Sequence, residues 1–288
     1  MKIKFILFIS IVSFLWSCDE VEEPFSDGII QPPEGSKRVL ILDFTGHNCA
    51  GCPAAAKSAS TTAEDYPNNV FVLTVHPDLN GLTTPLTEVE GDPFSTEWRT
   101  PEGNLMQAWF NIQFLPFGSV SAIEDNGNIS YTFANWRPVA EQNIFDERMV
   151  DLEIEIAYNE VSREIEISTD IDYLQDIEGN LNLMLAVVEN NIEDWQKNGN
   201  GIDQPADPDY TGGDIPDYIH KHILRTHLNG LEGQQVSSGT AASGSSFEYD
   251  NSGVISLDYV AEEVSIYAYI YNTETLEILD VVEKHIIE

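Results

Sequence analysis

Hydrophobic and polar positions follow one pattern in the first half of this chain and another in the second. In the first half, apolar runs at residues 39–44 and 70–75 indicate buried central strands. Between them, residues 54–63 are rich in alanine and predict a helix. A helix and a strand are expected again within residues 104–123. This order predicts an α/β domain, which we place at residues 37–148.

From residue 149 the period changes to two, because apolar and polar residues alternate in short segments separated by turn residues. This pattern predicts an all-β antiparallel sandwich of the immunoglobulin-like kind at residues 149–288. Two loops, at residues 199–217 and 236–246, are expected to interrupt it. Strands are expected at residues 152–158, 164–168, 181–188, 254–259, 264–270 and 276–282.

The start of the chain indicates export. Two lysines precede an apolar run at residues 5–16, which is too short to span a bilayer as a helix and is typical of a secretory signal. The run ends in Leu-Trp-Ser-Cys18, which resembles a bacterial lipobox, although tryptophan is atypical of that motif. We therefore predict a lipoprotein signal peptide at residues 1–17 and a lipid anchor on Cys18. Ordinary secretion, with Cys18 removed or unpaired, is the alternative.

Charge narrows the choice of partners. Residues 18–36 are acidic, contain several prolines and glycines, and predict a flexible tether. The whole chain has 49 acidic and 13 basic residues, a net charge of −36. Such a surface repels nucleic acid, so no nucleic-acid partner is expected. The acids after Cys18 resemble export tracts of some surface lipoproteins, which leaves both the periplasmic and the cell-surface side open.

Two of the three cysteines, Cys49 and Cys52, lie between the first predicted strand and the first predicted helix. A bridge between them closes almost no loop and adds little stability, which favours a redox or local structural role. A helix N-terminus stabilises a thiolate. We therefore predict Cys49 as a nucleophile at the exposed helix end and Cys52 as a more buried resolving thiol. A permanently oxidised, inert pair is the alternative.

This first half resembles thioredoxin in three respects. Strand, Cys-x-x-Cys, helix and strand follow in that order, and Asp43 stands six residues before Cys49. The segment from Phe110 to Phe117 aligns with the thioredoxin segment that ends in a cis-proline. The resemblance implies a thioredoxin-like domain, with Pro116 as its cis-proline. The residues before and between the cysteines differ from those of thioredoxin, so no redox direction is predicted.

The resemblance also implies roles for three further residues. Asp43 would be a buried carboxylate of raised pKa that exchanges a proton with Cys52. The alternative is an aspartate that hydrogen-bonds the turn. Pro116 would present the backbone of Leu115 to a bound peptide, or else only shape a tight turn.

Two histidines are expected near the cysteines. His47 lies two residues before Cys49, and His76 ends the second strand. A cationic histidine there would favour the thiolate. Surface or turn histidines are the preferred interpretation for both.

A second resemblance covers most of the chain. Asp43-Phe-Thr-Gly-His-Asn-Cys-Ala-Gly-Cys-Pro53 and Lys221-His-Ile-Leu-Arg-Thr-His-Leu-Asn-Gly230 are similar to motifs of the twenty-eight-kilodalton outer membrane protein family. This implies a thioredoxin-like domain followed by a β-sandwich, anchored in the outer membrane of a Gram-negative bacterium. Members of that family have been described as candidate adhesins or receptors.

Metal binding is not the favoured interpretation of the second half. His220 and His222 are expected to share one face of a strand, near His227, but no further ligand completes a zinc set. An acidic loop offers oxygen ligands for calcium without the spacing of a calcium-binding loop. Calcium is thus a weaker alternative to having no cofactor beyond the disulfide. The loop acids are Asp203, Asp207, Asp209, Asp214 and Asp217.

Together these features predict a lipid-anchored thiol–disulfide oxidoreductase. It would act through Cys49 and Cys52 on exported proteins or peptides that contain cysteines, and the membrane would be reached through the lipid on Cys18. The alternative is a non-enzymatic binding or adhesion lipoprotein of the outer membrane that uses a thioredoxin-like scaffold.

Overall fold

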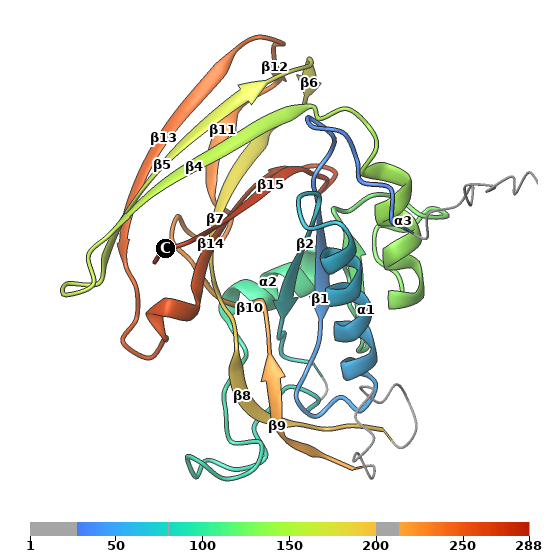
Figure 1. Cartoon of the computed structure of the whole chain (residues 1–288), viewed down its shortest axis with the longest axis vertical. Coiled ribbons are helices and arrows are strands. Elements are labelled where there is room, and N and C mark those ends of the chain that lie inside the picture. Colours follow the sequence, from blue (N-terminus) through green and yellow to red (C-terminus); the bar gives the residue numbers. More distant parts are fainter. Residues whose placement is uncertain (1–27, 80, 200–212, 288) are drawn as a thin grey trace, which may run out of the picture. The chain divides into compact units, whose positions relative to one another are not determined.

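An eight-stranded mixed sheet runs through both halves of the chain (Figure 1). The structure is a computed structural model that describes residues 28–79, 81–199 and 213–287. The predicted signal segment and the first part of the predicted tether lie outside this range. Residues 31–288 cluster as one unit. No helix in the described residues is long and apolar enough to cross a membrane.

The first half contains the predicted strands and helices. Strands β1 and β2 are parallel neighbours, and β3 pairs antiparallel with β1 at the edge of the sheet. Helix α1 joins β1 to β2, and Pro53 occupies its first turn, where a missing N–H costs nothing. The elements are β1 (Val39–Phe44), α1 (Cys52–Asp65), β2 (Val70–Val75), α2 (Pro101–Trp109), β3 (Phe117–Val120), the short η1 (Phe133–Asn135) and α3 (Trp136–Asn143).

Apart from the short 3-10 helix η2 (Ala261–Glu263), the second half is all β, as its alternating pattern predicted. Five of its strands extend the main sheet: β7 (Leu181–Glu189), β10 (Ile223–His227), β11 (Gln234–Ser237), β14 (Val264–Asn272) and β15 (Ile278–His285). Three form a second sheet: β4 (Val150–Tyr158), β5 (Glu164–Tyr173) and β13 (Ser246–Val254). Two short pairs complete the fold: β6 (Ile177–Glu178) with β12 (Thr240–Ala241), and β8 (Ile192–Gln196) with β9 (Ile215–His220).

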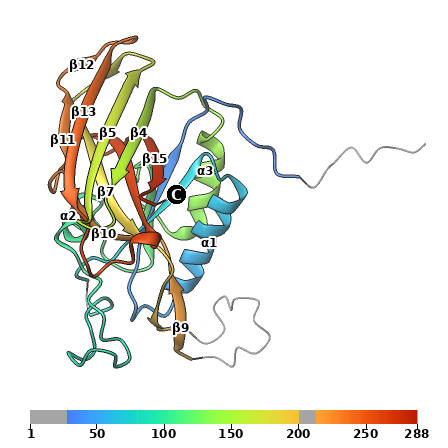
Figure 2. The ribbon, with the colours of Figure 1, turned by 60° about the vertical axis from the view of Figure 1, so that its left-hand side comes forward.

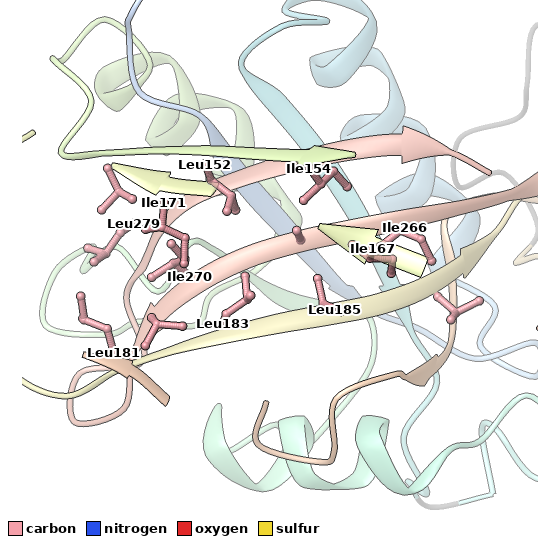
Figure 3. Close-up of a cluster of buried hydrophobic side chains, with 14 of the residues drawn as sticks. Leu152, Ile154, Ile167, Ile171, Leu181, Leu183, Leu185, Ile266, Ile270 and Leu279 are labelled. Carbon is pink, nitrogen blue, oxygen red and sulfur yellow. The ribbon is translucent and has the colours of Figure 1, made fainter. Parts of the chain in front are cut away.

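The two sheets of the second half enclose one hydrophobic core. Leu152, Ile154, Ile167 and Ile171 of the second sheet face Leu183 and other main-sheet residues in Figure 3, and all of them are buried. Helices α1 and α3 lie on the side away from β5 and β13 in both views (Figures 1 and 2). The alternating apolar positions thus form a packed sandwich core, which is the main source of stability for such strands.

Two local predictions in the second half were wrong. The predicted strand at residues 254–259 is a turn beyond Val254, whereas the predicted loop at residues 236–246 contains β12 and borders β13. Strand β13 was missed because Asn251 and Gly253 interrupt its apolar alternation. Nine residue pairs with β5 nevertheless hold it in the sheet, so tertiary pairing overrides the weak local pattern.

The main sheet crosses the predicted domain boundary after residue 148. Strand β10 lies between β7 and β2, and pairs with β2 through Ile223 and Thr74. A buried cluster on this sheet combines Leu42 and Phe44 of the first half with Tyr267 of the second. The boundary remains a prediction from the change in sequence period, but hydrogen bonds and core packing are continuous across it.

A buried ion pair also joins the two halves. Arg38, just before β1, donates from Nε to Oδ1 of Asp280 on β15 over 2.7 Å. Asp280 is fully buried and also accepts a hydrogen bond from the backbone N–H of Leu152 on β4. Because the carboxylate has no access to solvent, its charge depends on these donors.

Removing one partner of this pair should therefore destabilise the protein strongly. We expect Arg38→Ala to lower the free energy of unfolding by about 3–5 kcal/mol, because it leaves a buried charge uncompensated. The matched control is Arg137→Ala, which breaks more exposed pairs with Asp65 and Glu141 and should cost about 1 kcal/mol or less. Urea unfolding measures both, and equal losses would contradict the buried role of Arg38.

Candidate functional site

The Cys49–Cys52 disulfide lies in the turn between β1 and α1. The two sulfurs are bonded, and the Cα atoms are 5.4 Å apart. The backbone N–H of Cys49 donates to the oxygen of Gly46 over 3.0 Å, and that of Cys52 to the oxygen of Cys49 over 3.2 Å. Helix α1 begins at Cys52. The predicted order of strand, disulfide turn and helix is therefore confirmed.

A segment from the second half covers this turn. Gln196 Nε2 donates to the backbone oxygen of Cys49 over 3.1 Å. The backbone N–H of Lys197 donates to His47 O over 2.7 Å, and that of Gly199 to Ala50 O over 2.8 Å. We call residues Gln196–Gly199 the covering segment. Gln196, Lys197 and Gly199 thus bind the disulfide turn along its length.

Both cysteines are buried beneath this cover. Cys49 is 3% exposed and Cys52 is 1% exposed. The expectation that Cys49 lies at an exposed helix end is therefore wrong. A local sequence pattern places the turn at the end of a strand, but it carries no information on a strand that returns from about half a chain away.

Pro116 lies against the same turn. The Leu115–Pro116 peptide bond is cis, as the resemblance implied. A Cβ atom placed on Gly51 would lie 3.4 Å from Pro116 Cδ, so the second of the two residues between the cysteines faces the proline ring. Next to it, Phe114 is 52% exposed and its ring lies 4.6 Å from that of Phe117. The β3 edge thus presents apolar side chains beside the disulfide turn.

Asp43 is a buried carboxylate without a hydrogen-bond partner among the described residues. It is fully buried on β1, and neither oxygen accepts a hydrogen bond. Burial raises the pKa of Asp43 from its ordinary 3.8 to about 7. Asp43 and Cys52 contribute to the wall of one cavity of about 590 Å³. The alternative interpretation, an aspartate that hydrogen-bonds the turn, is therefore wrong.

His47 and His76 are both buried, so neither is a surface histidine, although His47 does lie in a turn, as one part of the preferred interpretation had it. His47 is fully buried, with Nε2 3.2 Å from Thr84 O, and His76 is 2% exposed. The ring of His76 stacks on Trp98 at 5.6 Å. Burial lowers the pKa of both imidazoles, which are therefore neutral near pH 7 and supply no positive charge to a thiolate.

The three histidines of the second half point to three different environments. His220 ends β9 and packs against Trp98 at 5.0 Å, whereas His222 has a φ of 56° and places Nδ1 3.2 Å from the Tyr267 hydroxyl. The expectation that both share one strand face is wrong, because the strand breaks between them. His227 lies on β10 beside Glu102, which accepts its backbone N–H.

The part of the chain that the structure describes contains no arranged set of metal ligands. There, no three His, Cys, Asp or Glu side chains are placed to hold a metal ion. Of the acids considered for calcium, Asp203, Asp207 and Asp209 lie outside the described residues.

Several residues of the site could not be found from the sequence. Gln196 contacts Cys49 across 147 positions, and no motif surrounds it. Trp98 and Phe94, which pack on the buried histidines, belong to a stretch whose many Pro, Gly and Thr residues predict only irregular structure. Lys57 and Lys221, which line the cavity, look like ordinary surface lysines in the sequence.

Comparison with known proteins now adds the family. The model of the family described as outer membrane protein Omp28 matches residues 104–288. The chain belongs to the Omp28 family. Its place is therefore the outer membrane of a Gram-negative bacterium, as the sequence predicted. The matched residues begin after the disulfide turn, so the match includes Pro116 and the covering segment but neither Cys49 nor Cys52.

Solved structures give weaker likenesses to this Omp28 chain. A domain of the outer membrane lipoprotein Omp28 from Porphyromonas gingivalis has 17% identity and a TM-score of 0.32, over 48% of this chain and 88% of that one. Protein AGR_C_4864 from Agrobacterium tumefaciens has 14% identity and a TM-score of 0.48, over 89% and 97%. No curated protein matches the chain.

The raised pKa of Asp43 predicts a pH-dependent stability. Between pH 3.8 and about 7 the folded protein holds a proton that the unfolded chain releases, so the free energy of unfolding falls as pH rises. Asp43→Asn removes this loss. The free energy of unfolding of the variant, measured relative to that of the natural protein, should therefore rise by about 4 kcal/mol as the pH goes from about 4 to about 8.

Urea unfolding of both proteins across this pH range measures the difference. The buried histidines have lowered pKa values and act in the opposite direction, but they are present in both proteins and cancel in the comparison. A difference that does not change with pH would show that Asp43 titrates as an exposed carboxyl group does.

Proposed function

We propose that this Omp28-family protein is a thiol–disulfide oxidoreductase of the outer membrane, built on a thioredoxin-like first half. The observation that carries the proposal is the disulfide at a strand-to-helix turn, with cis-Pro116 facing Gly51. Asp43, which has no hydrogen-bond partner among the described residues, lines the same cavity as Cys52. Each of these features has a separate use in disulfide exchange. Exported proteins or peptides with cysteines are the proposed substrates.

Exchange proceeds through a mixed disulfide. A substrate thiolate attacks Sγ of Cys49, the new S–S bond forms, and the bond to Cys52 breaks with its electron pair on Cys52 Sγ. A second substrate thiolate then attacks the substrate sulfur of the mixed disulfide and releases Cys49 as a thiolate. Two substrate thiols thus become one disulfide while the Cys49–Cys52 pair is reduced. The reverse sequence reduces a substrate disulfide.

Asp43 is the proposed proton carrier for Cys52. At its pKa of about 7, a buried carboxyl group donates a proton to the departing Cys52 thiolate or accepts one from the thiol with little driving force lost. It lies at the wall of the cavity to which Cys52 also contributes. The positioning of a proton donor there favours departure of Cys52 over Cys49 as the leaving sulfur.

Access to the pair requires displacement of the covering segment. Gln196 donates to backbone oxygens of both Gly46 and Cys49, and Gly199 donates to Ala50. These hydrogen bonds join neutral groups, each worth about 1 kcal/mol net. A substrate that pairs with the backbone at Leu115 would form new hydrogen bonds and so offset part of the free energy lost when the covering segment is displaced.

The proposal predicts that Cys52→Ser traps substrates. In this variant the Cys49 thiolate attacks a substrate disulfide, and the resulting mixed disulfide lacks the Cys52 thiol that would resolve it, so covalent adducts should accumulate in cells. Non-reducing electrophoresis after acid quenching detects them, and reductant should dissolve them. Cys49→Ser, which leaves only the resolving cysteine, is the matched control and should trap far less.

A second candidate function is favoured by the burial of the sulfurs. Cys49 is 3% exposed under the covering segment, as expected of an inert bridge in a binding or adhesion lipoprotein. A measured reduction potential separates the candidates. Absence of Cys49 adducts, together with a bridge that withstands strong reductant in the folded protein, would leave only the binding function.

We also propose that acyl chains on Cys18 anchor the protein. Cys18 lies outside the described residues, and the proposal rests on its lipobox-like context. Cells fed a labelled fatty acid should incorporate the label into the natural protein but not into Cys18→Ala, which should leave the membrane fraction. Label retained by Cys18→Ala would refute the anchor.

A further inference from the structure

The cavity beside the disulfide is large enough for a ligand of its own. Its volume is about 590 Å³, within the range of small-molecule sites. Helix α1 forms one wall, and β9 with the start of β10 forms the other. Val72, Ile215, Ile219 and Ile223 make much of the lining apolar. The described lining includes Cys52 but not Cys49, the proposed point of attack.

The mouth of the cavity carries unpaired positive charge. The described arginines and lysines pair with a carboxylate or donate to backbone oxygens, with the exception of Lys57, Lys197 and Lys221. Two of these three, Lys57 and Lys221, line this cavity, and both are exposed. In a chain of net charge −36, unpaired cations at one cavity are a marked exception.

The other titratable groups of the described lining do not cancel this charge. Burial lowers the pKa of His220 and of His222 to about 4, so both are neutral at pH 7. Asp43 is partly protonated there. Asp217 is exposed and contributes one negative charge against the two lysines. The Tyr218 phenol, whose pKa is raised to about 12, remains a neutral hydrogen-bond donor.

We propose that this cavity binds a small organic anion with an apolar body. Its carboxylate lies between Lys57 and Lys221, and its apolar part packs against Val72 and the isoleucines of β9. This site goes beyond disulfide exchange, because the oxidised protein binds the ligand without any covalent step. A cationic ligand is disfavoured by both lysines, and a fully polar anion would leave the apolar walls unused.

Three probes with one naphthalene body test the charge preference. Isothermal titration calorimetry of the full-length oxidised protein compares 2-naphthylacetate, 2-naphthaleneethanol and 2-(2-naphthyl)ethylamine. The carboxylate should bind about tenfold or more tightly than the alcohol, and the amine more weakly still. Raising the salt concentration from about 20 mM to about 500 mM should reduce the difference between the carboxylate and the alcohol.

Variants locate the binding. Lys57→Gln and Lys221→Gln should each weaken binding of 2-naphthylacetate by about three- to tenfold without affecting the alcohol. Lys284→Gln removes the same charge from a lysine that donates to Ile154 O, outside the described cavity lining, and should have no effect. Ala56→Trp fills the cavity from α1 and should abolish binding of both the carboxylate and the alcohol.

Thermal unfolding of each variant checks that the fold is intact. The proposal is overturned if the carboxylate binds no better than the alcohol, if Lys57→Gln and Lys221→Gln match Lys284→Gln, or if a folded Ala56→Trp binds normally. Because these experiments use the oxidised protein and no thiol, they succeed or fail independently of the Cys52→Ser trapping experiment.

Discussion

The covering segment is the constraint on which the chemistry of this protein depends. Its hydrogen bonds to Gly46, His47, Cys49 and Ala50 hold a strand of the second half against the disulfide turn. Without this cover, the start of α1 would present the two cysteines openly. With it, both sulfurs are shielded from solvent. Any reaction of the disulfide is therefore coupled to the position of β8, and through β9 to the cavity wall. In the proposed function and the proposed ligand site, disulfide reactivity and ligand access both depend on the paired strands β8 and β9.

Burial has a second consequence, because it removes charge from the surroundings of the disulfide. His47 and His76 are neutral near pH 7, and Asp43 is partly neutral. In thiol chemistry a nearby cation usually favours the thiolate. Here the buried neighbours offer neutral rings instead, and the cations of the same cavity, Lys57 and Lys221, are exposed to solvent. A thiolate on Cys52 would lie near a carboxyl group able to protonate it, which favours the closed disulfide or the neutral thiol over a persistent anion.

Much of this architecture could be predicted from the sequence, because its local signals are strong. The apolar run Val39–Phe44, the alanines of α1 and the alternation in β4 and β5 each determine one element by their own period. The cis bond before Pro116 followed from a contiguous resemblance. The burial of Cys49 and the separate environments of His220 and His222 did not, since they depend on contacts distant in the chain. Strand β13 was missed for the same reason: its partner β5, and not its own pattern, holds it in place.

The site is a joint product of two parts of the chain with different relationships to the family. The residues matched by the Omp28 model, 104–288, supply Pro116, the covering segment and the β9 and β10 wall. The unmatched part supplies Cys49, Cys52, Asp43 and Lys57. The main sheet, the Arg38–Asp280 pair and the cavity each draw on both parts, so the disulfide turn and the matched residues form one folded unit. The surroundings of the disulfide are therefore set as much by strands of the matched part, which return from about half a chain away, as by its own turn.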